Sequence, residues 1–213
     1  MSLYEIMISP ITTLFELGGA VLTLLALVSI FTLTVVIYKS WQFYVARIGR
    51  DNTIEQLLAL LDKGEQQQAE QLVCDSKHFL AHTAHLGLKL QNSKAEGIGQ
   101  RLEAEGEQKF LPLEKGLRTL DLIAQLAPLL GLLGTVLGMI EAFQALQNAG
   151  SHVDPAALAG GIWVALMTTA AGLFVAIPTS VALGWFEARI NAERVEAEHM
   201  FSVILTPMAQ LSV

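Results

Sequence analysis

The chain has 213 residues and a net charge of −7, and 53% of its side chains are hydrophobic against 15% charged. This composition, with a mean hydropathy of +0.49, excludes an ordinary soluble domain and predicts a membrane protein. The negative net charge argues against nucleic acid as a partner, and eleven basic side chains in residues 39–118 are balanced by eleven acidic ones.

The cationic side chains are distributed unevenly. All thirteen Lys and Arg residues lie between Lys39 and Arg118 or beyond Glu187. Basic residues close to membrane segments stay in the cytoplasm, so this asymmetry predicts that both basic stretches are cytoplasmic. The N-terminus is then outside and the C-terminus inside.

The N-terminal region predicts an anchored first span. Residues 1–16 are largely apolar around Pro10 and predict a short external interfacial helix. The uncharged run 17–38 follows, and 22 residues suffice for a helix to cross about 30 Å of hydrocarbon. No basic residue precedes this run, so we expect an anchor rather than a cleaved signal peptide.

Residues 39–120 are expected to form a cytoplasmic region of short helices. Thr53 and Gln56 have the spacing of a capping box and predict a helix start, and Gly64 ends the same amphipathic run. Further short helices are expected before the Asn92-Ser93 break.

The same region contains three histidines and the chain's one cysteine. His78, His82 and His85 have the spacing of one helix face, which suggests a metal site. Only Asp75 stands nearby to complete it, so a partly exposed polar face is the preferred interpretation, and no metal or other cofactor is expected. Cys74 has no partner for a disulfide and is expected to be a small, partly buried apolar residue.

Two more spans are predicted in the second half of the chain. A long helix is expected from Glu96, interrupted only by Pro112, directly into a span at 121–146. After an external loop at 147–154, Asp154-Pro155 predicts the start of the third helix, with Asp as N-cap. Residues 155–186 are too few for two spans and a turn, so they form one span, which continues into a cytoplasmic helix at 187–213.

The second and third spans each carry small residues and one threonine along a helix face. They are Gly131, Gly134, Thr135 and Gly138 in the second span, and Ala165, Thr169, Gly172 and Ala176 in the third. Such stripes allow close packing, with each threonine bonded to a helix carbonyl. The other interpretation is a polar ring that lines a pathway once several subunits assemble.

The stretches LAPLLGLLGTVLGMIEAF and GGIWVALMTTAAGLFVAIPTSVAL together resemble the signature of the MotA/TolQ/ExbB proton-channel family. Three spans with the main cytoplasmic segment after the first are most similar to ExbB and TolQ. The resemblance implies an all-α homopentamer around a central pore in the inner membrane of a Gram-negative bacterium. It also implies an ExbD- or TolR-like single-span partner with an intramembrane Asp, and a TonB- or TolA-like protein that the motor energises.

The resemblance also implies residue roles. The family's pore-facing threonines match Thr135 and Thr169, and its span prolines match Pro128 and Pro178, which loosen the helix locally. Val164 stands where ExbB and TolQ typically carry Glu. The ion-carrying carboxylate is therefore expected on the partner, and the ion is a proton, with sodium as the alternative.

Two acidic residues flank the second span. Asp121 is about 40° from Thr135 around a helix and is the candidate cytoplasmic mouth of the pathway, whereas Glu141 is about 120° away. The alternative for both is a solvated carboxylate at a helix end. Enzyme motifs such as G-x-S-x-G, a Walker loop or H-E-x-x-H are absent, so no catalytic residue is expected. A non-conducting membrane scaffold remains the competing interpretation.

Overall fold

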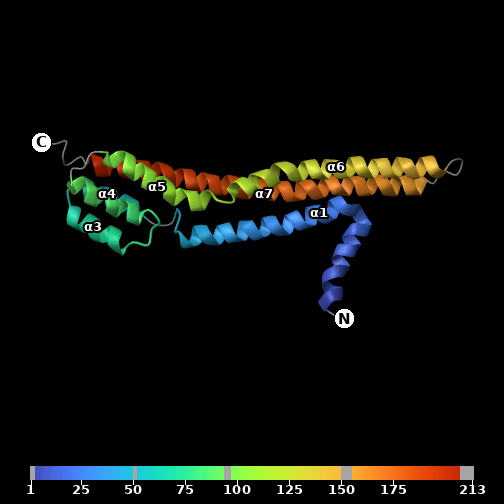
Figure 1. Cartoon of the computed structure of the whole chain (residues 1–213), viewed down its shortest axis with the longest axis horizontal. Helices are drawn as coiled ribbons and strands as arrows, with labels where there is room; N and C mark the ends of the chain where they lie inside the picture. Colours follow the sequence, from blue (N-terminus) through green and yellow to red (C-terminus); the bar gives the residue numbers. More distant parts are fainter. Residues whose placement is uncertain (1–2, 50–51, 94–96, 150–154, 207–213) are drawn as a thin grey trace. The chain divides into compact units, whose positions relative to one another are not determined.

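The structure is a computed structural model that describes residues 3–49, 52–93, 97–149 and 155–206, and these form helices joined by turns and short irregular segments. The helices are α1 (Leu3–Val45), α2 (Thr53–Asp62), α3 (Gln66–Asp75), α4 (Ala81–Ser93), α5 (Ile98–Glu114), α6 (Leu117–Ala149) and α7 (Pro155–Leu205) (Figure 1). Three segments are long and apolar enough to cross a membrane: Gly19–Val45, Leu117–Asn148 and Leu158–Leu205. The predicted all-α class with three candidate spans is confirmed.

Helix α1 covers both the predicted interfacial helix and the first span. Gly19 has a φ of +64°, a conformation that glycine adopts without the steric penalty of a Cβ atom. The ribbon of α1 changes direction in this region (Figure 1). A left-handed glycine therefore separates the two parts of the helix.

The predicted uninterrupted helix from Glu96 into the second span is wrong. Helix α5 ends at Glu114 and α6 begins at Leu117, with Gly116 between them at a φ of +93°. A left-handed residue directly after a helix stops the regular hydrogen-bond pattern, and glycine is favoured there. Pro112, the expected interruption, lies inside the last turn of α5.

The predicted capping box at the start of α2 is also wrong. Asn52 occupies the N-cap and makes no side-chain capping bond, while Thr53 is the first helical residue. The Thr53 hydroxyl is buried and receives a hydrogen bond of 3.2 Å from Ser76 Oγ. Gly64, with a φ of +78°, follows the end of the helix.

The histidines and the cysteine differ from expectation as well. His78 precedes α4, which begins at Ala81, so the three imidazoles do not share one helix face. Cys74 is exposed rather than partly buried, and its Sγ lies 3.6 Å from His85 Nδ1.

Helix α7 is uninterrupted over 51 residues and passes Phe186, where the third apolar run ends. At 1.5 Å per residue it is about 77 Å long, more than twice the thickness of a bilayer's hydrocarbon core. A large part of α7 therefore lies outside the membrane. The predicted N-cap Asp154 and most of the predicted external loop lie outside the described residues.

The chain divides into two compact units, which are described separately. The first contains residues 1–36 and 118–184. Its core joins α1 to α6 and α7 through Leu25, Ala127, Val175 and Ala176.

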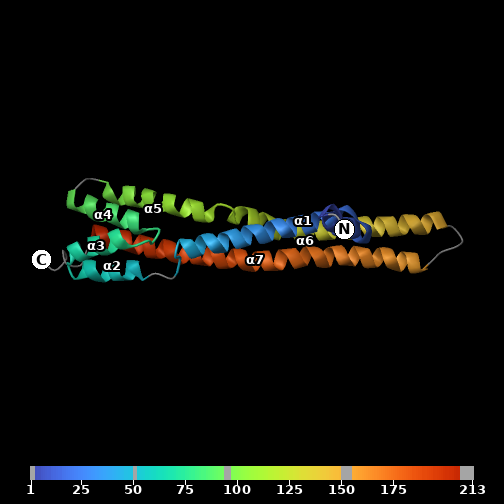
Figure 2. The same cartoon turned by 90° about the horizontal axis from the view of Figure 1, so that it is seen from below.

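The second unit contains residues 37–117 and 185–213. Helices α2 to α5 follow one another around the C-terminal part of α7 (Figure 2). Its fully buried side chains include Ile54, Leu57, Leu80, Leu102, Phe110, Phe186, Met200 and Ile204.

Candidate functional site

Helices α6 and α7 run side by side in the first unit and approach each other closely (Figure 1). A Cβ atom added to Gly172 would lie 2.5 Å from the Ala127 carbonyl oxygen, and one on Gly131 would lie 2.9 Å from the Thr168 carbonyl oxygen. Both distances are shorter than a van der Waals contact. Only glycine permits this separation of the two backbones.

The close contact continues along both helices. A Cβ on Gly134 would lie 2.5 Å from Thr168 Oγ1, and one on Gly138 would lie 3.2 Å from Ala165 Cβ. We call this contact the glycine seam, formed by Gly131, Gly134, Gly138, Ala165, Thr168 and Gly172. The predicted small residue Ala176 lies instead in the core shared with α1, where it is 5% exposed.

Three hydroxyl groups lie at or beside the glycine seam. Thr168 is 2% exposed, and its Oγ1 lies 2.7 Å from Ala165 O and 3.3 Å from Gly131 O. A hydroxyl has one proton, so the shorter contact to its own helix is the hydrogen bond. Thr168 was not singled out from the sequence, although it lies three residues after Ala165 and four before Gly172, on the same face.

The two threonines that the sequence selected differ in their partners. Thr169 is half-buried and donates across the seam to Gly131 O at 3.3 Å. Thr135 is half-buried and donates to Leu132 O on its own helix at 2.7 Å. In both threonines the hydroxyl proton is used in this hydrogen bond, and lone pairs of the hydroxyl oxygen remain available. Such an oxygen can accept a hydrogen bond from a protonated carboxyl group or coordinate a sodium ion.

No acidic residue occurs between Asp121 and Glu141, or in residues 155–186. Asp121 is half-buried and accepts a 2.7 Å hydrogen bond from Gln125 Nε2, while Glu141 is exposed. Val164 is half-buried on α7. The apolar parts of α6 and α7 therefore offer hydroxyl and carbonyl oxygens but no carboxylate of their own.

The two span prolines lie inside continuous helices. Pro128 is in α6 and Pro178 is in α7, and neither has a backbone N–H for the carbonyl one turn earlier. Pro178 also borders a cavity of about 270 Å³ between α1 and α7, together with the buried Thr32 and Thr179. Both of these threonines donate to carbonyls of their own helices.

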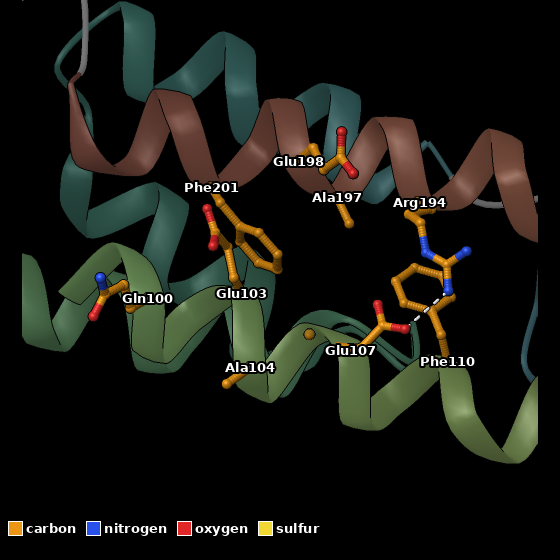
Figure 3. Close-up of a pocket in the computed structure, with 10 residues that line it drawn as sticks. Gln100, Glu103, Ala104, Glu107, Phe110, Arg194, Ala197, Glu198 and Phe201 are labelled. Carbon is orange, nitrogen blue, oxygen red and sulfur yellow. Dashed lines mark hydrogen bonds and ion pairs between the residues drawn. The ribbon is translucent and has the colours of Figure 1, made fainter. Parts of the chain in front are cut away.

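A cavity of about 730 Å³ lies in the second unit between α5 and α7 (Figure 3). Arg194 Nη2 binds Glu107 Oε1 at 3.1 Å and Glu114 Oε1 at 2.6 Å, and its guanidinium lies over the Phe110 ring. All three charged groups are partly exposed. This ion-pair network joins α5 to α7.

A buried acidic side chain joins the C-terminal part of α7 to the loop after α1. Glu193 is 4% exposed; its Oε1 accepts the Gly49 N–H at 2.6 Å, and its Oε2 lies 3.5 Å from His78 Nε2. His78 Nδ1 accepts the Leu80 N–H at 3.3 Å, which places the ring proton on Nε2, facing Glu193. No local pattern in the sequence indicates this cluster, because its members are far apart along the chain.

The side chain of Lys39 is buried. It is 2% exposed, and its Nζ donates to Gln42 Oε1 at 2.8 Å, Leu113 O at 2.9 Å and Pro112 O at 3.2 Å. All three ammonium protons have acceptors. The cation also lies at the C-terminal end of α5, where the helix dipole favours positive charge.

Three long apolar helices define a multi-pass helical membrane protein. Two of these helices pack closely at the glycine seam, with threonine hydroxyl groups beside the contact. The chain belongs to the MotA/TolQ/ExbB proton channel family, which it matches over residues 74–199. The family consists of transport-type membrane proteins rather than enzymes.

Similar proteins place the chain near ExbB and TolQ, as the sequence predicts. It is 35% identical over 196 residues to an ExbB-like biopolymer transport protein of Synechocystis, covering 87% of this chain and 73% of the relative. An ExbB homolog of Methanothermobacter thermautotrophicus is 31% identical over 183 residues, covering 84% and 64%. The Tol-Pal system protein TolQ of Haemophilus influenzae is 41% identical over 124 residues, covering 58% and 54%. The chain therefore spans about half to three quarters of the length of these relatives.

Proposed function

We propose that this chain is an ExbB/TolQ-like subunit of an ion-driven motor of the inner membrane. With an ExbD- or TolR-like partner it conducts protons, with sodium as the alternative ion, and energises a TonB- or TolA-like protein for transport at the outer membrane. Family membership and the biopolymer-transport and Tol-Pal names of its relatives support this class. The subunit forms a homopentamer with its N-terminus outside and its C-terminus in the cytoplasm.

The partial exposure and the hydrogen bonding of Thr135 are the observation that carries the proposal. It lies between Gly131 and Gly138 in sequence, yet it is half-buried while both glycines are buried in the glycine seam. Its hydroxyl bonds to its own helix. The hydroxyl proton is therefore used within the helix, and the lone pairs of the Thr135 oxygen remain available to a group on a partner.

In the proposed mechanism the partner supplies the carboxylate. Its intramembrane Asp takes up an ion near Thr135 and Thr169, whose oxygens accept a hydrogen bond from the protonated acid or contribute to sodium coordination. The neutralised Asp can then pass the apolar surface around the ring, because the desolvation penalty of a charge has been removed. Asp121 marks the cytoplasmic end of this path.

A non-conducting scaffold is the second candidate. It is favoured by the glycine seam and by the Thr169 hydroxyl, which is directed at Gly131 O across the helix contact. In that case both threonines serve only packing.

The substitutions Thr135→Val and Thr169→Val test the two functions, because they delete the hydroxyls with little change in shape. Thr34→Val is the matched control, since Thr34 on α1 is exposed and also donates to its own helix, at Ile30 O. Each variant is co-expressed with the partner; assembly is measured by size-exclusion chromatography and ion flux in vesicles. We expect flux to fall in the Thr135 and Thr169 variants alone, with assembly intact. Flux equal to that of the control in both variants would rule out the pathway, and loss of assembly in both would favour the scaffold.

A further inference from the structure

A smaller cavity of about 290 Å³ lies between the end of α1 and the C-terminal part of α5, within the second unit. Its wall is mainly apolar and includes Tyr38, Trp41, Val45, Phe79, Pro112 and Leu113. The one amide in its lining, Gln42, is already bonded, because its Nε2 donates to Pro112 O at 3.2 Å. An apolar chain is therefore a better occupant than a polar solute.

The sequence places this cavity at a membrane boundary. Tyr38 is the last residue of the first uncharged run, and Lys39 is the first cation after it. Tyr38 and Trp41 are 57% and 64% exposed, and such amphipathic aromatic rings are enriched at the level of the lipid headgroups. The cavity thus opens where acyl chains meet headgroups.

One cationic side chain completes the lining. Lys109 on α5 is half-buried at the cavity, and in the part of the chain that the structure describes no hydrogen bond or ion pair joins it to another residue. Lys39, by contrast, has acceptors for all of its protons. Lys109 is therefore the positive charge of this cavity that is free to meet a phosphate.

We propose that this cavity binds an anionic phospholipid of the leaflet on the Lys39 side. The acyl chain lies against the aromatic and aliphatic wall, and the phosphate lies at Lys109. A zwitterionic lipid brings its own cation to the phosphate, so Lys109 selects for net negative charge. Only the assignment of this leaflet to the cytoplasmic side rests on the proposed function.

The test uses the full-length protein in nanodiscs of equimolar phosphatidylglycerol and phosphatidylcholine with identical acyl chains. After extraction into detergent, the lipids retained per subunit are quantified by mass spectrometry. We expect phosphatidylglycerol to be enriched about fivefold, the effect of one basic residue near an anionic headgroup. The Lys109→Gln variant should lose this enrichment.

Arg101→Gln is the matched control, because it removes the same charge from an exposed position of the same helix. It should keep the enrichment. Ala46→Leu adds side-chain volume at the cavity without changing charge, and it should release one lipid per subunit. Size-exclusion chromatography and circular dichroism report whether each variant is folded.

Three results would overturn the proposal. The first is equal retention of the two lipids by the unchanged protein. The second is an equal loss of the phosphatidylglycerol enrichment in the Lys109 and Arg101 variants, which would indicate a diffuse attraction between the basic surface and anionic lipids. The third is a disulfide that joins two copies of a Trp41→Cys variant, formed in as large a fraction of the protein as is folded, while no lipid is retained. This result would show that a second copy of the chain closes the cavity.

Discussion

The glycine seam predicts that adding a single methyl group destabilises the protein at Gly172 relative to the same change at two other glycines of α7. In Gly172→Ala the new Cβ lies 2.5 Å from Ala127 O and 3.1 Å from Gly131 Cα. Both are backbone atoms, so no side chain can rotate away and the helices must separate. In Gly184→Ala and Gly160→Ala the new Cβ meets nothing within 4 Å.

The magnitude follows from the difference between these variants. Replacing glycine by alanine within a helix is favourable by about 1 kcal/mol, and this gain is common to all three positions. Overpacking costs roughly 1–3 kcal/mol and applies only to Gly172→Ala. The melting temperature of a chain of this size changes by about 2–4 °C per kcal/mol, so Gly172→Ala should melt about 2–12 °C below Gly184→Ala.

Thermal unfolding of the three purified variants in the same detergent, followed by tryptophan fluorescence, measures this difference. Helicity from circular dichroism before heating shows whether the spans still form. Equal melting temperatures for Gly172→Ala and Gly184→Ala would refute the close approach of α6 and α7.

Three further substitutions have expected outcomes in the same unfolding assay. Lys39→Met removes the ammonium and leaves the Leu113 carbonyl without its donor, while Pro112 O keeps the hydrogen bond from Gln42 Nε2. This loss should cost about 1–3 kcal/mol, and an unchanged melting temperature would contradict the buried capping role. Gly116→Ala forces a residue with a Cβ into a φ of +93° and should cost about 1–2 kcal/mol; a gain in stability would show that α5 and α6 are continuous. Arg194→Met removes partly exposed ion pairs and should cost less than about 1 kcal/mol, and a loss above 3 kcal/mol would show that the network is more deeply buried than the structure indicates.

Local properties of the sequence predicted the spans and the small-residue faces. The length of an apolar run and the spacing of glycines depend only on residues within the same helix, so three spans and Gly131, Gly138 and Gly172 could be selected without a partner helix. The register between helices is not local. Thr168 and Thr169 are neighbours in sequence, and only the position of Gly131 shows that Thr168 is the buried one.

Contacts between distant residues account for the errors. Gly116 was not recognised as a helix end, because Pro112 offered a stronger local signal and the cap depends on Lys39, more than seventy residues away. Lys39 fits the pattern of a boundary cation, and only the carbonyl oxygens of α5 make its burial possible. The pairing of Glu193 with His78 and Gly49 likewise requires three segments that share no local pattern.

The unbroken course of α7 has a mechanical consequence. The described residues of α7 include no left-handed residue, and apart from Pro155 at its first position its proline is Pro178, within the apolar run. A twist applied near Thr169 is therefore transmitted as a twist near Phe201, since a regular helix resists torsion along its axis. The α5–α6 connection is interrupted by the left-handed residue Gly116, so a twist of α6 is not transmitted to α5 in this way. Helix α7 thus continues from the first unit into the second without a break, as the part of α1 after Gly19 does, whereas α5 and α6 are separated at Gly116.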